Sequence, residues 1–143
     1  MKTYFAASIR GGSEDRDIYL RIIEFLGQYG EVLTEHTSNT MFGEAGDERV
    51  KDRDVYNRDV QWLEESDVVI AEITQPSLGV GYELGRAEHL RKPIFCLYRT
   101  IPDREISPII TGNQNLRIHP YGSLDDAFDI LKSFFGELGI DNA

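Results

Sequence analysis

The sequence is nearly free of cysteine, with Cys96 as the single example in 143 residues. One cysteine forms no disulfide within the chain and builds no cysteine-rich metal site. It also favours a reducing compartment. No apolar run approaches the roughly 18 residues of a membrane helix, and no signal peptide precedes the first strand-like segment. We therefore expect a soluble, cytoplasmic protein with no membrane partner.

Basic residues are also scarce. Lys and Arg number 15 against 25 Asp and Glu, which gives a formal charge of −10. A chain with so few cations has no broad face to displace counterions, so we expect no nucleic acid polymer as a partner. One small phosphorylated ligand in a local pocket is still compatible with this charge. The three histidines are scattered without metal-ligand spacing, and we expect no metal and no cofactor.

The hydrophobic pattern, by contrast, alternates in a regular way. Strand-like segments are predicted at 3–9, 31–34, 67–73, 93–98 and 116–121, and helical periodicity at 15–29, 52–66, 79–91 and 124–138. Two segments without a clear period, 35–51 and 100–115, are predicted to be long loops. This order predicts one α/β domain over residues 1–143: a doubly wound, Rossmann-like or flavodoxin-like sheet of five parallel strands flanked by helices.

Ligands of such sheets bind beyond the carboxyl ends of the strands, near the point where the strand order reverses. The candidate segments are therefore 8–13, 35–47, 74–85 and 99–115. In the first of them, Gly11 and Gly12 allow backbone N–H groups to approach an anion, and Arg10 supplies a forked cation. The alternative is a tight turn between strand and helix with a surface arginine.

The third candidate segment contains glycines at 79, 81 and 85, which do not match the dinucleotide-binding pattern. Ser77 and Gly79 nevertheless lie where a helix begins, and their hydroxyl and backbone donors suit a phosphate. Glu83 lies one turn into that helix. A carboxylate there is a candidate catalytic group, although it is commonly only a favourable partner of the helix dipole.

Glycosidic cleavage needs two carboxylates that flank one bond. Glu83 is one candidate and Asp59 is another. Asp59 is one of five acidic residues between 52 and 65, so spacing alone does not select it over a solvated acidic face.

Four segments together resemble a known family. They are residues 4–12 (YFAASIRGG), 33–36 (LTEH), 59–63 (DVQWL) and 71–86 (AEITQPSLGVGYELGR). Over roughly residues 3 to 135 the chain is similar to the 2′-deoxynucleoside 5′-phosphate N-hydrolases of the nucleoside 2-deoxyribosyltransferase superfamily. The resemblance implies a doubly wound fold and an N-glycosidase. Its reaction would release a free base and 2-deoxyribose 5-phosphate from a deoxynucleoside 5′-monophosphate.

The resemblance also implies roles for particular residues. Glu83 matches the nucleophile that forms a covalent deoxyribosyl intermediate. Asp59 matches the general acid that protonates the leaving base and later activates water. Tyr4 matches a tyrosine at the end of the first strand that helps to set the nucleophile. If the enzyme is retaining, the two carboxylates should lie about 5–5.5 Å apart.

The implied substrate-binding residues surround these three. They are Ala7, Ile9, Arg10, Gly11, His36, Ser77, Gly79 and Ser107. Among them, Ile9 and His36 match positions near the base, and Ser107 matches a phosphate-binding serine that a second subunit supplies. A homodimer is therefore implied. Segment 37–51 aligns poorly with the family, and the preferred base stays open.

Three other functions remain as alternatives. A nucleoside 2-deoxyribosyltransferase would move deoxyribose between bases and accept an unphosphorylated 5′-hydroxyl. A ribonucleotide monophosphate N-glycosidase would tolerate a 2′-hydroxyl. A binding module would hold the nucleotide without turnover, although such a module has no need of Tyr4, Asp59 and Glu83 together.

Overall fold

The apolar runs of the sequence form a single parallel sheet. In the computed structural model, which describes residues 1–9, 13–37 and 51–142, the strands are β1 (Lys2–Ala7), β2 (Glu31–Leu33), β3 (Val68–Glu72), β4 (Ile94–Tyr98) and β5 (Arg117–Pro120). Their order in the sheet is β2-β1-β3-β4-β5, and all neighbours are parallel. The prediction of a five-stranded, doubly wound α/β fold is confirmed.

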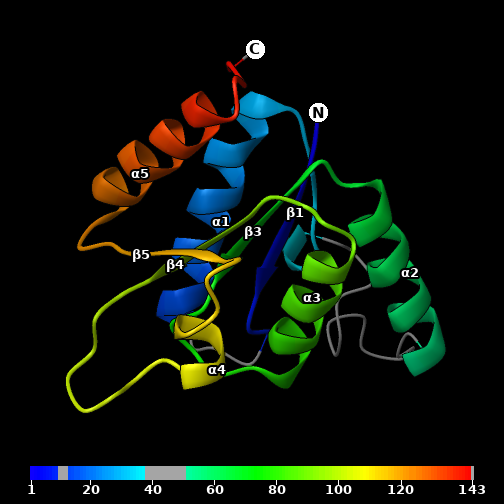
Figure 1. Cartoon of the computed structure of the whole chain (residues 1–143), viewed down its shortest axis with the longest axis horizontal. Helices are drawn as coiled ribbons and strands as arrows, with labels where there is room; N and C mark the ends of the chain where they lie inside the picture. Colours follow the sequence, from blue (N-terminus) through cyan, green and yellow to red (C-terminus); the bar gives the residue numbers. More distant parts are fainter. Residues whose placement is uncertain (10–12, 38–50, 143) are drawn as a thin grey trace.

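Four longer helices cover the two faces of this sheet (Figure 1). Helices α1 (Ser13–Leu26) and α5 (Leu124–Glu137) lie on one face, and α2 (Asp52–Glu65) and α3 (Leu78–His89) lie on the other. In the described part of the chain, every helix is too short or too polar to cross a membrane.

Two details differ from the predicted elements. The helix expected at 15–29 ends at Leu26 and continues as a 3-10 turn, η1 (Gly27–Tyr29). The loop expected at 100–115 contains a four-residue helix, α4 (Pro108–Thr111). A proline suits the first position of a helix because its fixed φ is already helical, and four residues are too few to show a period in the sequence.

Strand alternation divides the core into two layers. On β1, Phe5 and Ala7 pack toward α1 and α5, whereas Tyr4 and Ala6 pack toward α2 and α3. The first layer is rich in aromatic pairs between the helices, such as Tyr29 stacked on Phe135 with ring centroids 4.2 Å apart. The strand period of two therefore directs the buried Tyr4 side chain under the α2–α3 layer.

A buried polar network joins the carboxyl ends of the central strands to α1. Glu72 is fully buried at the end of β3, and it accepts hydrogen bonds from the Thr74 backbone N–H (2.7 Å), the Thr74 hydroxyl (2.8 Å) and the Tyr121 hydroxyl. Arg99, which follows β4, has its Nε 3.8 Å from Glu72 and forms a salt bridge with Asp15 in the first turn of α1. One guanidinium thus neutralises two carboxylates that have little contact with water.

This network generates a stability prediction. Replacing Arg99 by Met leaves Glu72 and Asp15 without their cation, and we expect a loss of about 3 kcal/mol, the lower end for breaking a buried pair because Arg99 is partly exposed. Urea unfolding at pH 7 measures the loss. The control is Arg117→Met, which breaks an exposed pair with Glu137 and should change stability little. Equal losses in the two variants would contradict the prediction.

Candidate active site

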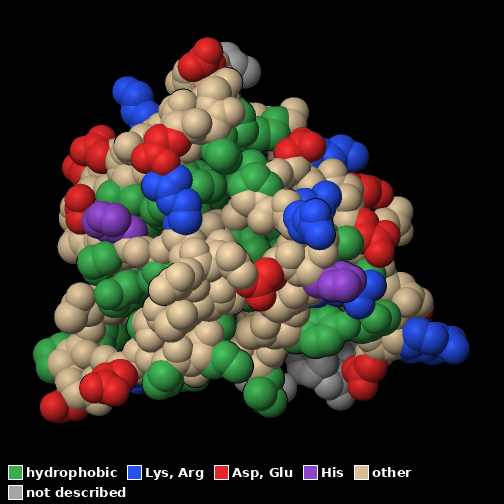
Figure 2. All heavy atoms as spheres, in the orientation of Figure 1, with side chains coloured by type: hydrophobic (Ala, Val, Ile, Leu, Met, Phe, Trp, Pro, Cys, Tyr) green, Lys and Arg blue, Asp and Glu red, His purple; other side chains and the backbone are tan. Residues whose placement is uncertain are grey.

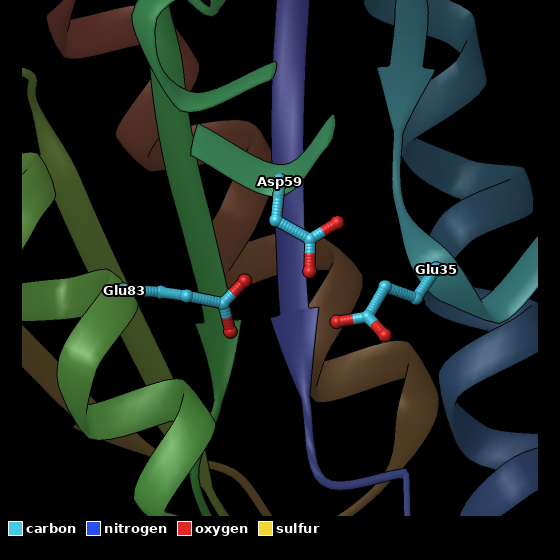
Figure 3. A group of neighbouring side chains, drawn as sticks. All are labelled: Glu35, Asp59 and Glu83. Carbon is cyan, nitrogen blue, oxygen red and sulfur yellow. The ribbon is translucent and has the colours of Figure 1, made fainter. Parts of the chain in front are cut away.

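Three carboxylates meet where the strand order reverses, between β1 and β3. Glu35 comes from the 3-10 turn η2 (Glu35–Thr37) that follows β2, Asp59 from α2 and Glu83 from α3. One carboxylate oxygen of each residue lies within 4.8 Å of one from each of the others. Figure 3 shows the three side chains pointing toward one another in front of β1. Asp59 and Glu83 are buried and Glu35 is half-buried.

Tyr4 lies at the base of this cluster. It is 1% exposed, and its hydroxyl donates a hydrogen bond to Oε2 of Glu83. Burial raises the pKa of Tyr4 far above its ordinary value, and the negative charges of Glu83 and Asp59 raise it further. The hydroxyl therefore stays a proton donor at any physiological pH. The resemblance implied a tyrosine at the end of the first strand. Tyr4 is instead the third residue of β1.

Glu83 is poised to change its charge near neutrality. Burial raises the pKa of its carboxyl to about 7. The hydrogen bond from Tyr4 and the charge of Arg58 oppose this shift, and the neighbouring charge of Asp59 adds to it. A nucleophilic carboxylate must be ionised, so Tyr4 and Arg58 favour the reactive form of Glu83.

Arg58 is the cation of the cluster. Its Nε donates to Oδ1 of Asp59 at 3.1 Å, and its Nη2 lies 3.6 Å from Oε2 of Glu35. The guanidinium also lies over the ring of Trp62, 4.7 Å from the centroid. A single guanidinium thus neutralises part of the charge of three acids, and its stacking on Trp62 restricts the position of that charge.

Sequence reasoning assigned no role to Glu35 or Arg58. The available signal for Glu35 was its place directly after the strand at 31–34, inside a segment already chosen as a ligand-binding candidate. Arg58 gave no signal, because it is one of several charges on an amphipathic helix. The structure brings Tyr4, Asp59 and Glu83 together, as the resemblance implied.

Carboxylate oxygens at this spacing also suit a divalent cation. In the described residues, however, two of these oxygens already accept hydrogen bonds from side chains. The Tyr4 hydroxyl already binds one oxygen of Glu83, and the Arg58 guanidinium already binds one oxygen of Asp59.

The predicted phosphate-binding residues are only partly described. Ser77 is the N-cap of α3, where its hydroxyl oxygen accepts a hydrogen bond from the Val80 N–H at 3.2 Å. Its own hydrogen remains available to donate to an anion. A Cβ built on Gly79 would meet only Ser77 Oγ, at 3.8 Å, so packing within the chain does not require glycine there. Arg10 and Gly11 lie outside the described residues, as does most of segment 37–51.

Two residues predicted to contact substrate are joined at the end of β1. The Nε2 of His36 lies 3.0 Å from the carbonyl oxygen of Ala7, and the imidazole contacts the rings of Phe5 and Tyr19 edge-on. Burial lowers the pKa of His36, so the ring is neutral at pH 7 and donates to Ala7. Ile9 is exposed. Contact of Ala7 with the substrate, and of Ile9 and His36 with the base, stays a prediction.

An apolar groove of about 810 Å³ lies between α3 and α4. Two apolar side chains at its edge are strongly exposed, Leu78 at 97% and Ile109 at 80%. Figure 2 shows hydrophobic side chains gathered over α4 and the adjacent end of α3. Ser77 and Ser107 both line this groove, whereas Tyr4 and the three carboxylates do not.

Comparison with known proteins agrees with this geometry. The model of the nucleoside 2-deoxyribosyltransferase family matches residues 3–120. The 5-hydroxymethyl-dUMP N-hydrolase of Danio rerio is 45% identical over 141 residues, which cover 96% of this chain and 98% of that protein. The protein of the same name from Homo sapiens is 51% identical over 110 residues, or 76% of this chain and 63% of the human one.

Two solved structures share the fold. The CMP N-glycosidase of Clostridium botulinum superposes with a TM-score of 0.70 at 20% identity, over 93% of this chain and 99% of that one. The 2-deoxyribosyltransferase of Bacillus psychrosaccharolyticus has a TM-score of 0.68 at 18% identity, over 100% and 99% of the two chains.

The chain belongs to the nucleoside 2-deoxyribosyltransferase family. The relatives' names confirm the prediction of an N-glycosidase within that family.

The hydrogen bond between Tyr4 and Glu83 generates a pH prediction. Tyr4→Phe removes a donor to the ionised carboxylate, so the pKa of Glu83 should rise from about 7. A hydrogen bond to a charged group contributes about 1.5–3 kcal/mol, which corresponds to one to two pH units. Titration of the ¹³C-labelled Glu83 carboxyl by NMR measures the shift. Tyr98→Phe is the control and should leave the titration unchanged. An unshifted Glu83 in Tyr4→Phe would contradict the assigned contact.

Proposed function

We propose that this chain hydrolyses the N-glycosidic bond of 2′-deoxynucleoside 5′-monophosphates and releases a free base and 2-deoxyribose 5-phosphate. The reaction passes through a covalent intermediate on Glu83. The observation that carries this proposal is the meeting of Glu83, Asp59 and Tyr4 in one buried cluster at the switch point of the sheet.

The spacing of the carboxylates supports a retaining mechanism. Retaining glycosidases hold their two carboxyl groups about 5–5.5 Å apart, whereas inverting enzymes leave about 6.5–9.5 Å for a water molecule. Oxygens of Asp59 and Glu83 lie within 4.8 Å of each other. This spacing fits the retaining arrangement, in which Glu83 is the attacking group.

The reaction has two steps. A Glu83 oxygen bonds to C1′ while the bond from C1′ to the base nitrogen breaks, and Asp59 gives its proton to the departing base. A water molecule then attacks C1′, Asp59 takes a proton from that water, and the bond from C1′ to Glu83 breaks. The Tyr4 hydroxyl favours the ionised form of Glu83 before the attack, and it stabilises the same carboxylate again when the bond to C1′ breaks.

Substrate phosphate is held by neutral donors and by a second subunit. Ser77 and the first turn of α3 offer a hydroxyl and a helix N-terminus on the same helix as Glu83. Ser107 lies across the apolar groove on the loop before α4, and its side chain makes no capping hydrogen bond. A second copy of this chain seated on Leu78 and Ile109 would cover the groove and bring its own Ser107 to the neighbouring site.

Base preference follows from the relatives by name alone. The proteins from Danio rerio and Homo sapiens are named for 5-hydroxymethyl-dUMP. That nucleotide is therefore the first substrate to test, beside the four common deoxynucleoside monophosphates.

Chromatographic detection of released base tests the reaction. The wild-type chain should release base from at least one deoxynucleoside 5′-monophosphate, and more slowly from the matching nucleoside and ribonucleotide. Glu83→Gln should lower kcat by at least about 10³-fold, as loss of a nucleophile does, while nucleotide binding stays intact by calorimetry. Glu24→Gln, an exposed change on α1, is the control.

Other product patterns would contradict the proposal in distinct ways. Base exchange between unphosphorylated nucleosides, without hydrolysis, would define a deoxyribosyltransferase. Equal turnover of CMP would define a ribonucleotide N-glycosidase. Binding without any turnover in the wild-type chain would define a binding module.

Subunit mixing tests the shared site. In a mixed dimer of Glu83→Gln and Ser107→Ala chains, one site has both wild-type residues and the other has neither. When equal amounts of the two chains exchange fully, about half of the dimers are mixed. Each mixed dimer has one intact site out of two, so activity should reach about a quarter of wild type. If Ser107 acts within its own chain, the mixture will show only the average of the two separate variants.

A further inference from the structure

Glu35 has no part in the two steps proposed above, yet it lies among the groups that perform them. One of its oxygens is within 4.8 Å of oxygens of both Asp59 and Glu83, and hydrogen bonding to Asp59 is among the causes that raise the pKa of Glu35. Its main chain belongs to η2 and Asp59 belongs to α2, so the contact joins two separate elements. Figure 3 shows the Glu35 carboxyl turned toward Asp59.

A hydrogen bond between two carboxyl groups requires a proton. An ionised carboxylate is only an acceptor, so two ionised groups repel each other and form no such bond. One proton therefore belongs to the Glu35–Asp59 pair when the contact is made. Without it, three carboxylates would share Arg58 as the cation that the described residues place beside them, in a space with little water.

We propose that Glu35 is a positioning residue that keeps one proton on the Glu35–Asp59 pair at neutral pH and so maintains Asp59 as the acid for the leaving base. The inference rests on the proposed function, and it adds a third carboxylate to the two that the reaction itself requires. Glu35 acts through Asp59 and does not bond to the substrate.

The charged neighbours of Glu35 favour this protonated pair. Negative charges face it from α2 (Asp59) and α3 (Glu83), and the Tyr4 hydroxyl on β1 lies in the same cluster. Arg58 is the opposing cation. Burial and the neighbouring carboxylates outweigh it and raise the pKa of Glu35 to about 8.

His36, the adjacent residue, adds no charge to the pair. Its ring is turned to the Ala7 carbonyl and is neutral, because burial lowers its pKa. Between pH 7 and 8 the proposed reaction needs a proton on the Glu35–Asp59 pair and an ionised Glu83. The pKa values of about 8 for Glu35 and about 7 for Glu83 are in this order. This is the separation that an acid and a nucleophile need within one site.

The proton balance closes over one turnover. The pair begins with one proton and gives it through Asp59 to the departing base, which receives the electron pair of the broken bond. Both carboxyl groups are then ionised. The attacking water loses one proton to Asp59, and the hydrogen bond to Glu35 forms again.

The test is the pH dependence of kcat/KM for Glu35→Gln. A glutamine keeps the size of the side chain and donates a hydrogen bond to Asp59, but it holds no exchangeable acid proton and favours the ionised form of Asp59. We expect the alkaline limb to move to lower pH by at least about one unit, which is a tenfold loss at pH 8. At pH 6 the loss should be smaller, and KM should change less than kcat.

Two variants separate this role from a structural one. Glu35→Asp retains an acid at the position and should keep the alkaline limb near that of wild type, with a lower kcat. Glu31→Gln, an exposed change at the start of β2, should leave the whole profile unchanged. Urea unfolding verifies that all three variants fold.

Two results would overturn the inference. One is an alkaline limb that does not move in Glu35→Gln. The other is a loss of wild-type activity in EDTA that Mg²⁺ restores, with no such response in Glu35→Gln, because Glu35 would then hold a cation. If the wild-type chain releases no base at all, the proposed function fails. NMR titration of the Glu35 carboxyl still tests whether the pair shares a proton, because Asp59→Asn should then lower the titration midpoint of Glu35.

Discussion

Among the described residues, three carboxylates share the guanidinium of Arg58 in a largely buried space, and the rest of the site depends on this constraint. Two like charges about 5 Å apart repel by several kcal/mol even at an effective dielectric constant of 20. This repulsion and burial together raise the pKa values of Glu35 and Glu83 above the ordinary value of a carboxyl group. The Tyr4 hydroxyl and the Arg58 guanidinium determine which of them carries the negative charge.

The fold creates this constraint through strand alternation at the switch point. Because side chains of a strand alternate, Tyr4 faces α2 and α3, while Phe5 faces α1. The opposite face of the same sheet end contains a second acidic group, Glu72, but there the partners are Thr74, Tyr121 and Arg99, and every carboxylate oxygen has a donor. The two faces thus use similar residues differently. On one face both oxygens of Glu72 accept hydrogen bonds, whereas on the other face three carboxylates lie against one another beside Tyr4 and Arg58.

The sequence predicted the sheet well, because near-continuous apolar runs such as 67–73 have few alternatives to a buried parallel strand. It also indicated Glu83, through the glycines and serine at the start of its helix. Asp59 could be selected only by resemblance, since five acids fall between 52 and 65. The structure separates them physically: Asp52, Asp54, Glu64 and Glu65 are exposed, and Asp59 is the buried one. The place of Glu35 in the site depends on contacts between η2 and α2, which are separate in sequence, and no local sequence pattern encodes such contacts.

The charge of the site also determines where a phosphate can lie. Arg58 is committed to the carboxylates, so a phosphate close to them would meet net negative charge. Ser77 precedes Glu83 by six residues, or about 9 Å along a helix axis. At that separation the repulsion between two unit charges falls to about 2 kcal/mol at an effective dielectric constant of 20, which helix N-terminal donors and serine hydroxyls can offset. Distance and neutral donors would therefore allow a strongly acidic chain to bind the proposed anionic substrate. A donor from a second subunit across the groove, the role proposed for Ser107, would add to the end of the ligand that lies farthest from Glu83.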